Sequence, residues 1–182
     1  MKQILTLILA GILCATMAKA EDHMLEDFTG ATASDWTYLS DQVMGGVSQG
    51  QAQVDRDGSV PFIHLAGTVS TENRGGFIQV RRLLPNGLPD DTAALTLTAR
   101  GHNGPYFLHL RTTGTRLPWQ YYQAEFPVTA DWDSVTIPLS AFKPSGRLLR
   151  QSVRPADIRS IGIVAYGRDH QADVSVAAIE LR

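Results

Sequence analysis

Residues 46–50, Gly-Val-Ser-Gln-Gly, satisfy the G-x-S-x-G pattern that holds the nucleophilic serine of many hydrolases. In such an elbow a strand enters a sharp turn and a helix leaves it, so that the hydroxyl is held beside an oxyanion hole. The residues after Ser48 contain a glycine and no amphipathic stripe, and Asp57-Gly58 ends the segment as a hairpin turn would. The sequence therefore predicts a strand after Ser48 instead of the helix that an elbow needs.

The other members of a catalytic triad are also hard to place. Asp169 and His170 follow Ser48 in a suitable chain order, but adjacent residues are poorly placed for an aspartate that must orient the histidine. We therefore expect no catalytic residue and no enzyme activity, with a hydrolase as the weakest alternative. Gly45-Gly46 is better explained by positive backbone dihedral angles or very close packing. The Ser48 side chain is better explained by a bond to nearby backbone.

A second glycine pair, Gly75-Gly76, invites comparison with phosphate-binding loops. Neither pair precedes a helical pattern or a Lys-Ser/Thr pair, so we expect tight turns and no cofactor. Asp41 and Asn73 lie beside these turns, where they can cap backbone amides or join a calcium site of oxygen ligands. No acidic cluster accompanies them and the five histidines lack zinc-like spacing, so we predict no metal, with calcium as the alternative.

Three alternating segments carry polar side chains on the parity opposite to their apolar residues. The candidate binding residues on this parity are Gln79, Arg81, His109, Arg111, Tyr121, Gln123 and Glu125. If the strands are neighbours, one sheet face can bind a polar ligand or peptide, because arginine supplies forked donors and tyrosine a stacking surface. The simpler interpretation is that these residues only solvate a half-buried sheet.

Trp119 lies in a segment with two following tyrosines, and we expect it on an exposed loop. Aromatic side chains on loops can stack on sugar rings, which makes Trp119 a candidate glycan contact. Ordinary sandwich packing explains the same residues equally simply. Trp132 directly precedes an alternating strand, and we expect its ring in the core.

The elements that must position these residues are short strands. Apolar and polar residues alternate in segments such as 94–100, 106–111 and 134–139, and Gly, Pro, Asn or Asp bounds each segment. Helical periodicity is almost absent, apart from a single helical turn that we expect at 155–158. Strands at this spacing predict an all-β fold, an antiparallel β-sandwich.

Residues 1–20 have a lysine, an apolar run and an Ala18-Lys19-Ala20 end, which is typical of a signal peptide cleaved before Glu21. We expect residues 21–182 to form a single domain in the periplasm, with no membrane span. The only cysteine, Cys14, leaves with the signal, so the mature chain has no disulfide. Its net charge becomes −4 instead of −2, and no basic cluster points to nucleic acid.

Five segments follow one another in a fixed order: WTYLSDQVMGGVS at 36–48, GTVSTENRGGFIQVR at 67–81, YFLHLRT at 106–112, YQAEF at 122–126 and WDSVTIPLSAF at 132–142. This series resembles the complex I intermediate-associated protein 30 family. The resemblance implies a jelly roll of the galactose-binding-domain-like type. It also implies structural roles for the family-motif residues, which are Trp36, Asp41, Met44, Gly45, Gly46, Ser48, Asn73, Gly75, Gly76 and Phe77.

Mitochondrial members of that family act as assembly chaperones for respiratory complex I. The resemblance therefore implies a non-catalytic exported domain that binds a protein partner of unknown identity, as an assembly or folding helper. A carbohydrate-binding module that uses the polar face or the Trp119 loop is the alternative, because fold alone does not decide function.

Overall fold

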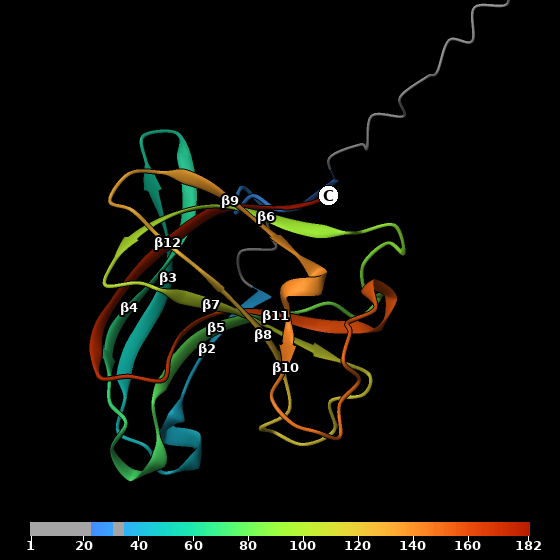
Figure 1. The fold of residues 1–182 in the computed structure, drawn as a ribbon. Helices are drawn as coiled ribbons and strands as arrows, with labels where there is room; N and C mark the ends of the chain where they lie inside the picture. The colour runs from blue at the N-terminus through green and yellow to red at the C-terminus, as the bar shows by residue number, and fades with distance from the viewer. Residues whose placement is uncertain (1–22, 31–34) are drawn as a thin grey trace, which may run out of the picture.

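The computed structural model describes residues 23–30 and 35–182, and strands dominate this part of the chain (Figure 1). The strands are β1 (His23–Glu26), β2 (Trp36–Ser40), β3 (Gln49–Asp57), β4 (Val60–Val69), β5 (Phe77–Leu83), β6 (Ala94–His102), β7 (Tyr106–Thr112), β8 (Tyr122–Phe126), β9 (Asp133–Pro138), β10 (Lys143–Pro144), β11 (Ile158–Tyr166) and β12 (His170–Leu181). Short 3-10 turns are η2 (Asp41–Met44), η3 (Glu72–Arg74), η4 (Leu139–Ala141) and η5 (Pro155–Asp157).

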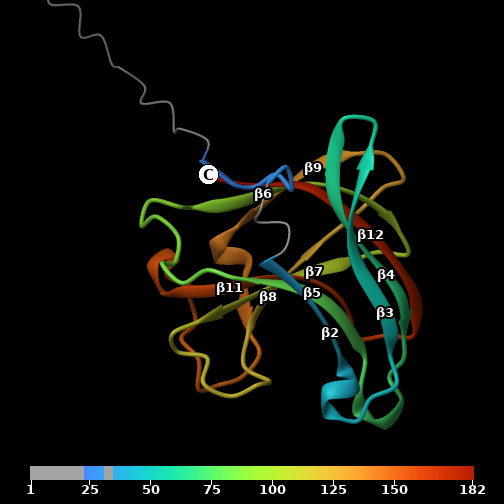
Figure 2. The same ribbon diagram turned by 180° about the vertical axis from the view of Figure 1, so that it is seen from behind.

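These strands form two antiparallel sheets that stack face to face (Figures 1 and 2). Sheet I has the order β3-β4-β12-β6-β9, and β1 pairs with β12. Sheet II has the order β10-β8-β7-β11-β5-β2. Neighbouring strands often come from distant parts of the chain, as where β12 lies between β4 and β6. The predicted antiparallel jelly-roll sandwich is therefore confirmed.

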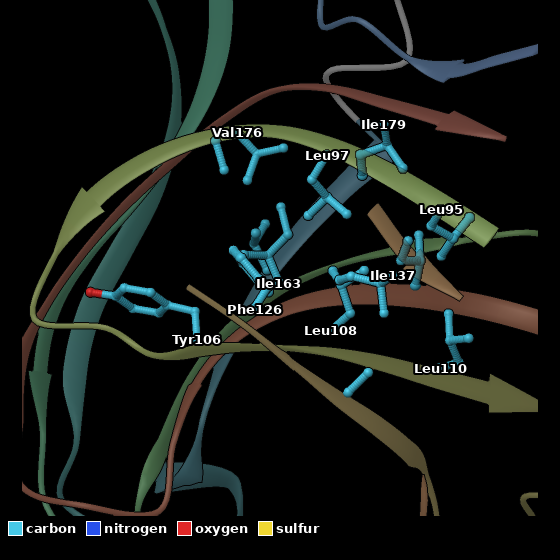
Figure 3. Close-up of a cluster of buried hydrophobic side chains, with 14 of the residues drawn as sticks. Leu95, Leu97, Tyr106, Leu108, Leu110, Phe126, Ile137, Ile163, Val176 and Ile179 are labelled. Atoms are coloured by element: carbon cyan, nitrogen blue, oxygen red, sulfur yellow. The ribbon is translucent and has the colours of Figure 1, made fainter. Parts of the chain in front are cut away.

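The core lies between the two sheets and receives side chains from both (Figure 3). β7 supplies Leu108 and Leu110 from sheet II, and Leu97 and Ile179 come from sheet I; all four are fully buried. Full burial of one such side chain contributes about 1.5–3 kcal/mol relative to exposure. This apolar layer is therefore the main source of the fold's stability.

β7 illustrates why the sequence folds into half-buried strands. Every second residue from Tyr106 to Thr112 is buried, whereas His109 and Arg111 between them are only partly buried. Successive side chains of a strand point to opposite faces, so this alternation gives the strand one core face and one outer face. The same strand thus stabilises the sandwich and supplies polar groups to its surface.

The predicted local signals are found where the sequence places them. β3 and β4 form a hairpin in which Asp57 lies opposite Val60, and Gly58 in the turn has a φ of 60°. η5 is the single helical turn expected near residue 155. These short-range patterns need no tertiary information, because turn residues and a proline fix them locally.

Trp132 corrects one expectation, because its ring is outside the core. It packs on the outer face of sheet I, with its centroid 5.4 Å from that of Phe62 and 4.4 Å from the guanidinium carbon of Arg100. The reason is strand parity. Trp132 shares its parity with the exposed Ser134, whereas the buried Ile137 of β9 has the other parity.

The predicted signal peptide, residues 1–20 with Cys14, lies outside the described residues. Close to the first of the described residues, Glu26 is buried and accepts hydrogen bonds from Trp36 Nε1 at 2.9 Å and from Arg82 at 2.8 Å. Trp36 thus joins β1 to β2 and the core, as its expected structural role requires. Within residues 23–30 and 35–182 no helix is both long enough and apolar enough to cross a membrane.

Two groups of connections project at the bottom of Figure 1, one where the chain passes between the two sheets and one within sheet II. One group contains η2 and η3, which lie side by side although they are far apart in the sequence. The other contains the connection 113–121 between β7 and β8. The outer face of sheet II lies between these projections.

Candidate binding groove

The outer face of sheet II brings several predicted residues into one register. Gly162 of β11 lies opposite Arg81 of β5 and His109 of β7, and Ser160 lies opposite Arg111. Neighbouring strands are about 4.8 Å apart, so these positions share a small area. Gly162 has no side chain and Ser160 a short one, which leaves space between the longer side chains of β5 and β7.

That space is a groove with a volume of about 940 Å³. β5, β7 and β11 form its floor, whereas η2 and η3 form one wall with Val43, Met44 and Arg74. The opposite wall is the connection 113–121, which contributes Pro118 and Trp119. The volume is in the range of about 300–1,000 Å³ that is common for small-molecule and oligomer-unit sites.

Aromatic rings line the groove next to β7. His109 and Tyr121 stack with centroids 4.1 Å apart and 9° between their planes. Tyr166 meets both rings at a steep angle, with its centroid 5.8 Å from His109 and 6.3 Å from Tyr121. Trp119 stands at the rim and is 64% exposed. The groove therefore combines a packed aromatic surface with one free indole.

His109 is neutral in this setting. Burial lowers the pKa of its imidazole to about 3, and Gln123 beside it raises the pKa by a smaller amount. Its Nε2 is buried and has no hydrogen-bond partner among the described residues. A neutral imidazole stacks without carrying a charge, so His109 extends the aromatic surface of the groove. The positive charge of the groove therefore comes from its arginines.

Arg111 shapes the wall that carries Trp119. Its guanidinium donates to the carbonyl oxygens of Pro118 at 2.8 Å and Leu117 at 3.0 Å, which anchors the connection to β7. Burial lowers the pKa of Arg111, and the positive charge of Arg81 lowers it further. An arginine stays charged despite such shifts, so two like charges lie close together in the groove.

Asp41 joins the two turns of the opposite wall. It is fully buried at the start of η2, and it accepts hydrogen bonds from Ser48 Oγ at 2.5 Å and from the amides of Gly76 at 2.5 Å, Ser48 at 2.9 Å and Phe77 at 3.2 Å. Burial raises the pKa of the Asp41 carboxyl, but these hydrogen bonds more than reverse this and hold the pKa below its ordinary value. One carboxylate thus fixes η2 against the segment after η3.

The glycines around Asp41 are required by space and by backbone angle. A Cβ on Gly46 would lie 2.3 Å from Asp41 Cγ, and a Cβ on Gly75 would lie 2.4 Å from Asp41 Oδ2. Gly45 ends η2 with a φ of 88°, in the left-handed region that favours glycine. Both explanations predicted for the first glycine pair, a positive dihedral angle and close packing, are therefore confirmed, one at each glycine.

Ser48 belongs to this junction as well. Its side chain is fully buried, its hydroxyl donates to Asp41, and it accepts a hydrogen bond from the Ser70 amide at 3.0 Å. β3 follows it directly, as predicted, and Asp169 accepts hydrogen bonds from Thr71 instead of orienting an imidazole toward Ser48. Ser48 therefore links the β2–β3 connection to Ser70, and its hydroxyl is buried and hydrogen-bonded within the protein.

The calcium alternative finds no support at these turns. Among the residues that the structure describes, no group of three His, Cys, Asp or Glu side chains is placed to hold a metal ion. The Asp41 oxygens accept hydrogen bonds from the protein itself, and Asn73 serves the turn through a left-handed backbone conformation with φ of 53°.

The sequence pattern of one protein family, complex I intermediate-associated protein 30 (CIA30), matches residues 26–176. The chain belongs to the CIA30 family. The matched region includes the Asp41 junction and every strand that contributes to the groove. Among curated proteins, none matches this CIA30 chain.

Solved structures similar to this CIA30 chain include carbohydrate-binding modules of Clostridium thermocellum. A family 11 module in complex with a beta-1,3-1,4-mixed-linked tetrasaccharide is 16% identical, with a TM-score of 0.71, covering 88% of this chain and 94% of that chain. The family 11 module of the cellulase Lic26A-Cel5E is 16% identical, with a TM-score of 0.72 and coverage of 88% and 93%. A family 30 module of the same organism is 14% identical, with a TM-score of 0.56 and coverage of 81% and 91%. At these identities the likeness shows the shared jelly-roll fold of the galactose-binding-domain-like type.

The structure brings most of the predicted binding residues together. The groove is lined by six of them: Gln79, Arg81, His109, Arg111, Trp119 and Tyr121. Gln123 lies next to His109 across the β7–β8 pair, and Glu125 is exposed opposite Phe107, outside the groove. The groove follows β5 and β11 along most of their length and leaves out β8, which parity alone does not reveal.

Two CIA30 motif residues, for which structural roles are expected, also line the groove. Met44 is 61% exposed and lines the groove, and Phe77 lines it from the start of β5. Sequence reasoning missed Arg74 and Ser145, which reach the groove from connections between strands. It also missed Tyr166, although Tyr166 shares its parity with Ser160 and Gly162 on β11, and that alternation was a usable signal.

Proposed function

We propose that this CIA30 protein is an exported, non-catalytic binding protein whose groove over sheet II holds a glycan chain. The observation that carries the proposal is the aromatic lining, in which His109, Tyr121 and Tyr166 pack together beside the exposed Trp119. Aromatic rings offer sugars a flat apolar surface, and neighbouring polar groups bind their hydroxyls. Gln79 and Ser145 supply such polar groups within the groove.

The shared fold supports this proposal, because one similar solved structure is a carbohydrate-binding module in complex with a tetrasaccharide. A binding role also needs no activated nucleophile, which agrees with the enclosed hydroxyl of Ser48. The signal-like residues 1–20 support a periplasmic location. Fractionation of cells should place the protein in the periplasm, and recovery from the cytoplasm would contradict the location.

A glycan array with the purified protein tests the binding role. We expect a defined set of oligosaccharides to bind, and Trp119→Ala to weaken the best of them at least tenfold, which corresponds to about 1.4 kcal/mol. The matched control is Trp132→Ala, which removes the same ring from the outer face of sheet I. Both variants should remain folded by circular dichroism. Equal binding by the wild type and Trp119→Ala would contradict the proposal.

An assembly helper for an envelope protein is the second candidate, and one observation favours it. Val43 and Met44 at the tip of η2 are 71% and 61% exposed, so the groove wall presents apolar side chains that a protein partner can cover. The family name, complex I intermediate-associated protein, agrees with such a role. A photo-crosslinker at position 44 should then capture one defined envelope protein, and Val43→Ser should reduce its capture. Crosslinking that is independent of Val43 would count against a helper.

A further inference from the structure

The groove is positively charged, whereas the whole chain has a slightly negative net charge. The protein has 16 lysines and arginines against 18 acidic residues, a net charge of −2. The groove nevertheless contains Arg74, Arg81 and Arg111, and none of the aspartates and glutamates that the structure describes lines it. His109 is neutral, so the arginines alone set the charge there.

The positive surface continues into a neighbouring hollow of about 420 Å³. This hollow shares Arg81 and Arg111 with the groove and adds Arg116 and Arg159, with no acidic lining residue from the described part of the chain. Five guanidinium groups therefore follow one connected depression over sheet II. Acidic residues elsewhere keep the protein negative overall, so this concentration of positive charge is local.

Arg81 is the exceptional member of this group. Other partly buried arginines have acceptors: Arg82 donates to Glu26, Arg100 to Asp57, and Arg111 to backbone carbonyls. Arg81 is also partly buried, yet it has no hydrogen bond or ion pair among the described residues. None of its nitrogens is among the buried polar atoms that lack a partner, so its N–H donors are open to the groove. An anion that binds between Arg81 and Arg111 would accept charge-assisted hydrogen bonds from these donors.

We propose that the groove selects an anionic glycan, with Arg81 as the residue that binds its carboxylate or sulfate group. This inference rests on the proposed function and names the substrate class of the same site. Arg81 and Arg111 flank the small residues of β11 on the groove floor, so an acidic substituent can lie between the two guanidinium groups while its sugar ring lies on the aromatic lining. Further charges along the chain meet Arg116 and Arg159 in the adjoining hollow.

Matched pairs of glycans test this selection by calorimetry. Oligogalacturonate and its methyl ester share one backbone and differ in charge, and dextran sulfate with dextran forms the corresponding sulfate pair. We expect the charged member of at least one pair to bind ten times more tightly than its neutral analogue, with an affinity that falls as salt is added. The pair that shows the difference identifies the anionic group.

Arg81→Gln should abolish the preference for the charged member, so that the charged and neutral members bind this variant with similar affinity. Arg111 is unsuitable for this test, because it also anchors the Trp119 connection. Arg56→Gln, on exposed β3 of sheet I, is the matched control and should bind like the wild type. Equal affinity for charged and neutral members, or an unchanged preference in Arg81→Gln, would overturn the inference.

Three other outcomes are distinguishable. Binding of neutral glycans alone would leave the proposed function intact and overturn only the charge selection. No binding of any glycan would contradict the proposed function itself. If polyglutamate binds in an Arg81-dependent way and the acidic glycans do not, the groove is a site for acidic peptides and the inference is wrong.

Discussion

The hydroxyl of Ser48 lies 2.5 Å from a carboxylate oxygen of Asp41 within the β2–β3 connection. The same carboxylate accepts a hydrogen bond from the amide of Gly76, which joins this connection to the β4–β5 connection in one wall of the groove. Three backbone amides donate to the same carboxylate. The CIA30 signature residues around Asp41 thus fix the position of η2 and η3. Their chemistry is structural, and it positions residues such as Met44 that face the groove.

Asp41→Asn should destabilise the protein by about 2–3 kcal/mol, because the new amide group places N–H donors where the protein also presents donors. Urea denaturation followed by fluorescence measures this change in the free energy of unfolding. Asp55→Asn, on the exposed strand β3, is the control and should change the free energy little. A similar small effect at both positions would count against the junction.

The same carboxylate should make stability depend on acid. Burial raises the pKa of Asp41 and its hydrogen bonds more than reverse this, so the folded pKa lies below the unfolded value of about 3.9. The stabilisation is then complete above that value and is lost as pH falls through the folded pKa. The stability difference between the wild type and Asp41→Asn should therefore shrink below about pH 4. A difference that stays constant to pH 2 would contradict this sign.

Gly46→Ala and Gly75→Ala should each lower the melting temperature, because the new Cβ would overlap Asp41. Overpacking of this kind typically costs about 1–3 kcal/mol. Gly146→Ala is the matched control, since a Cβ there meets nothing within 4 Å. Thermal unfolding of the three variants separates the local clash from the general effect of replacing glycine.

Much of the fold could be predicted from sequence, because strand period and turn chemistry are local properties. β7 shows this most clearly, since its alternation predicts both the buried Leu108 and the outward His109. Trp132 was misplaced although its parity matches exposed Ser134, because its position directly before an alternating strand suggested the core. The Asp41 junction could only be outlined, since a contact between residues 41 and 76 depends on the folded topology.

The groove itself was less predictable than the face that contains it. Parity placed Arg81 and Glu125 on one face, but the register of β7 with β8 puts Glu125 beside Phe107, away from the groove. Arg74 and Ser145 come from connections whose course depends on the fold. The absence of acidic lining residues therefore becomes visible only in three dimensions.

His109 should remain neutral across the range in which histidines usually titrate. Its folded pKa of about 3 is below the ordinary value of about 6.5, so the folded state binds fewer protons than the unfolded state between these values. Stability should consequently fall as pH is lowered through this range, and His109→Gln should remove that part of the decline. NMR shifts of the His109 ring should stay constant from pH 7 to pH 5. A midpoint near pH 6 would contradict the buried, stacked environment.

Filling the floor of the groove should weaken binding without unfolding the protein. A Cβ on Gly162 would lie 3.3 Å from Gln79 Oε1 and 3.8 Å from Arg81 Cβ, so alanine nearly fits and valine projects further into the groove. We expect glycan affinity to fall in the order Gly162, alanine, valine, with at least a tenfold loss for valine, whereas melting temperatures change little. Calorimetry and thermal unfolding check the two parts. Unchanged affinity in Gly162→Val would place the ligand elsewhere.

The most direct test of a glycan site over sheet II is an NMR titration of the ¹⁵N-labelled protein with the tightest-binding oligosaccharide from the array. We predict that the amide shifts which change will cluster at β5, β7, β11 and the connection 113–121, and that those of β3, β4 and β9 in sheet I will stay fixed. Changes centred on sheet I, or no changes at saturating oligosaccharide, would contradict a glycan site in this groove.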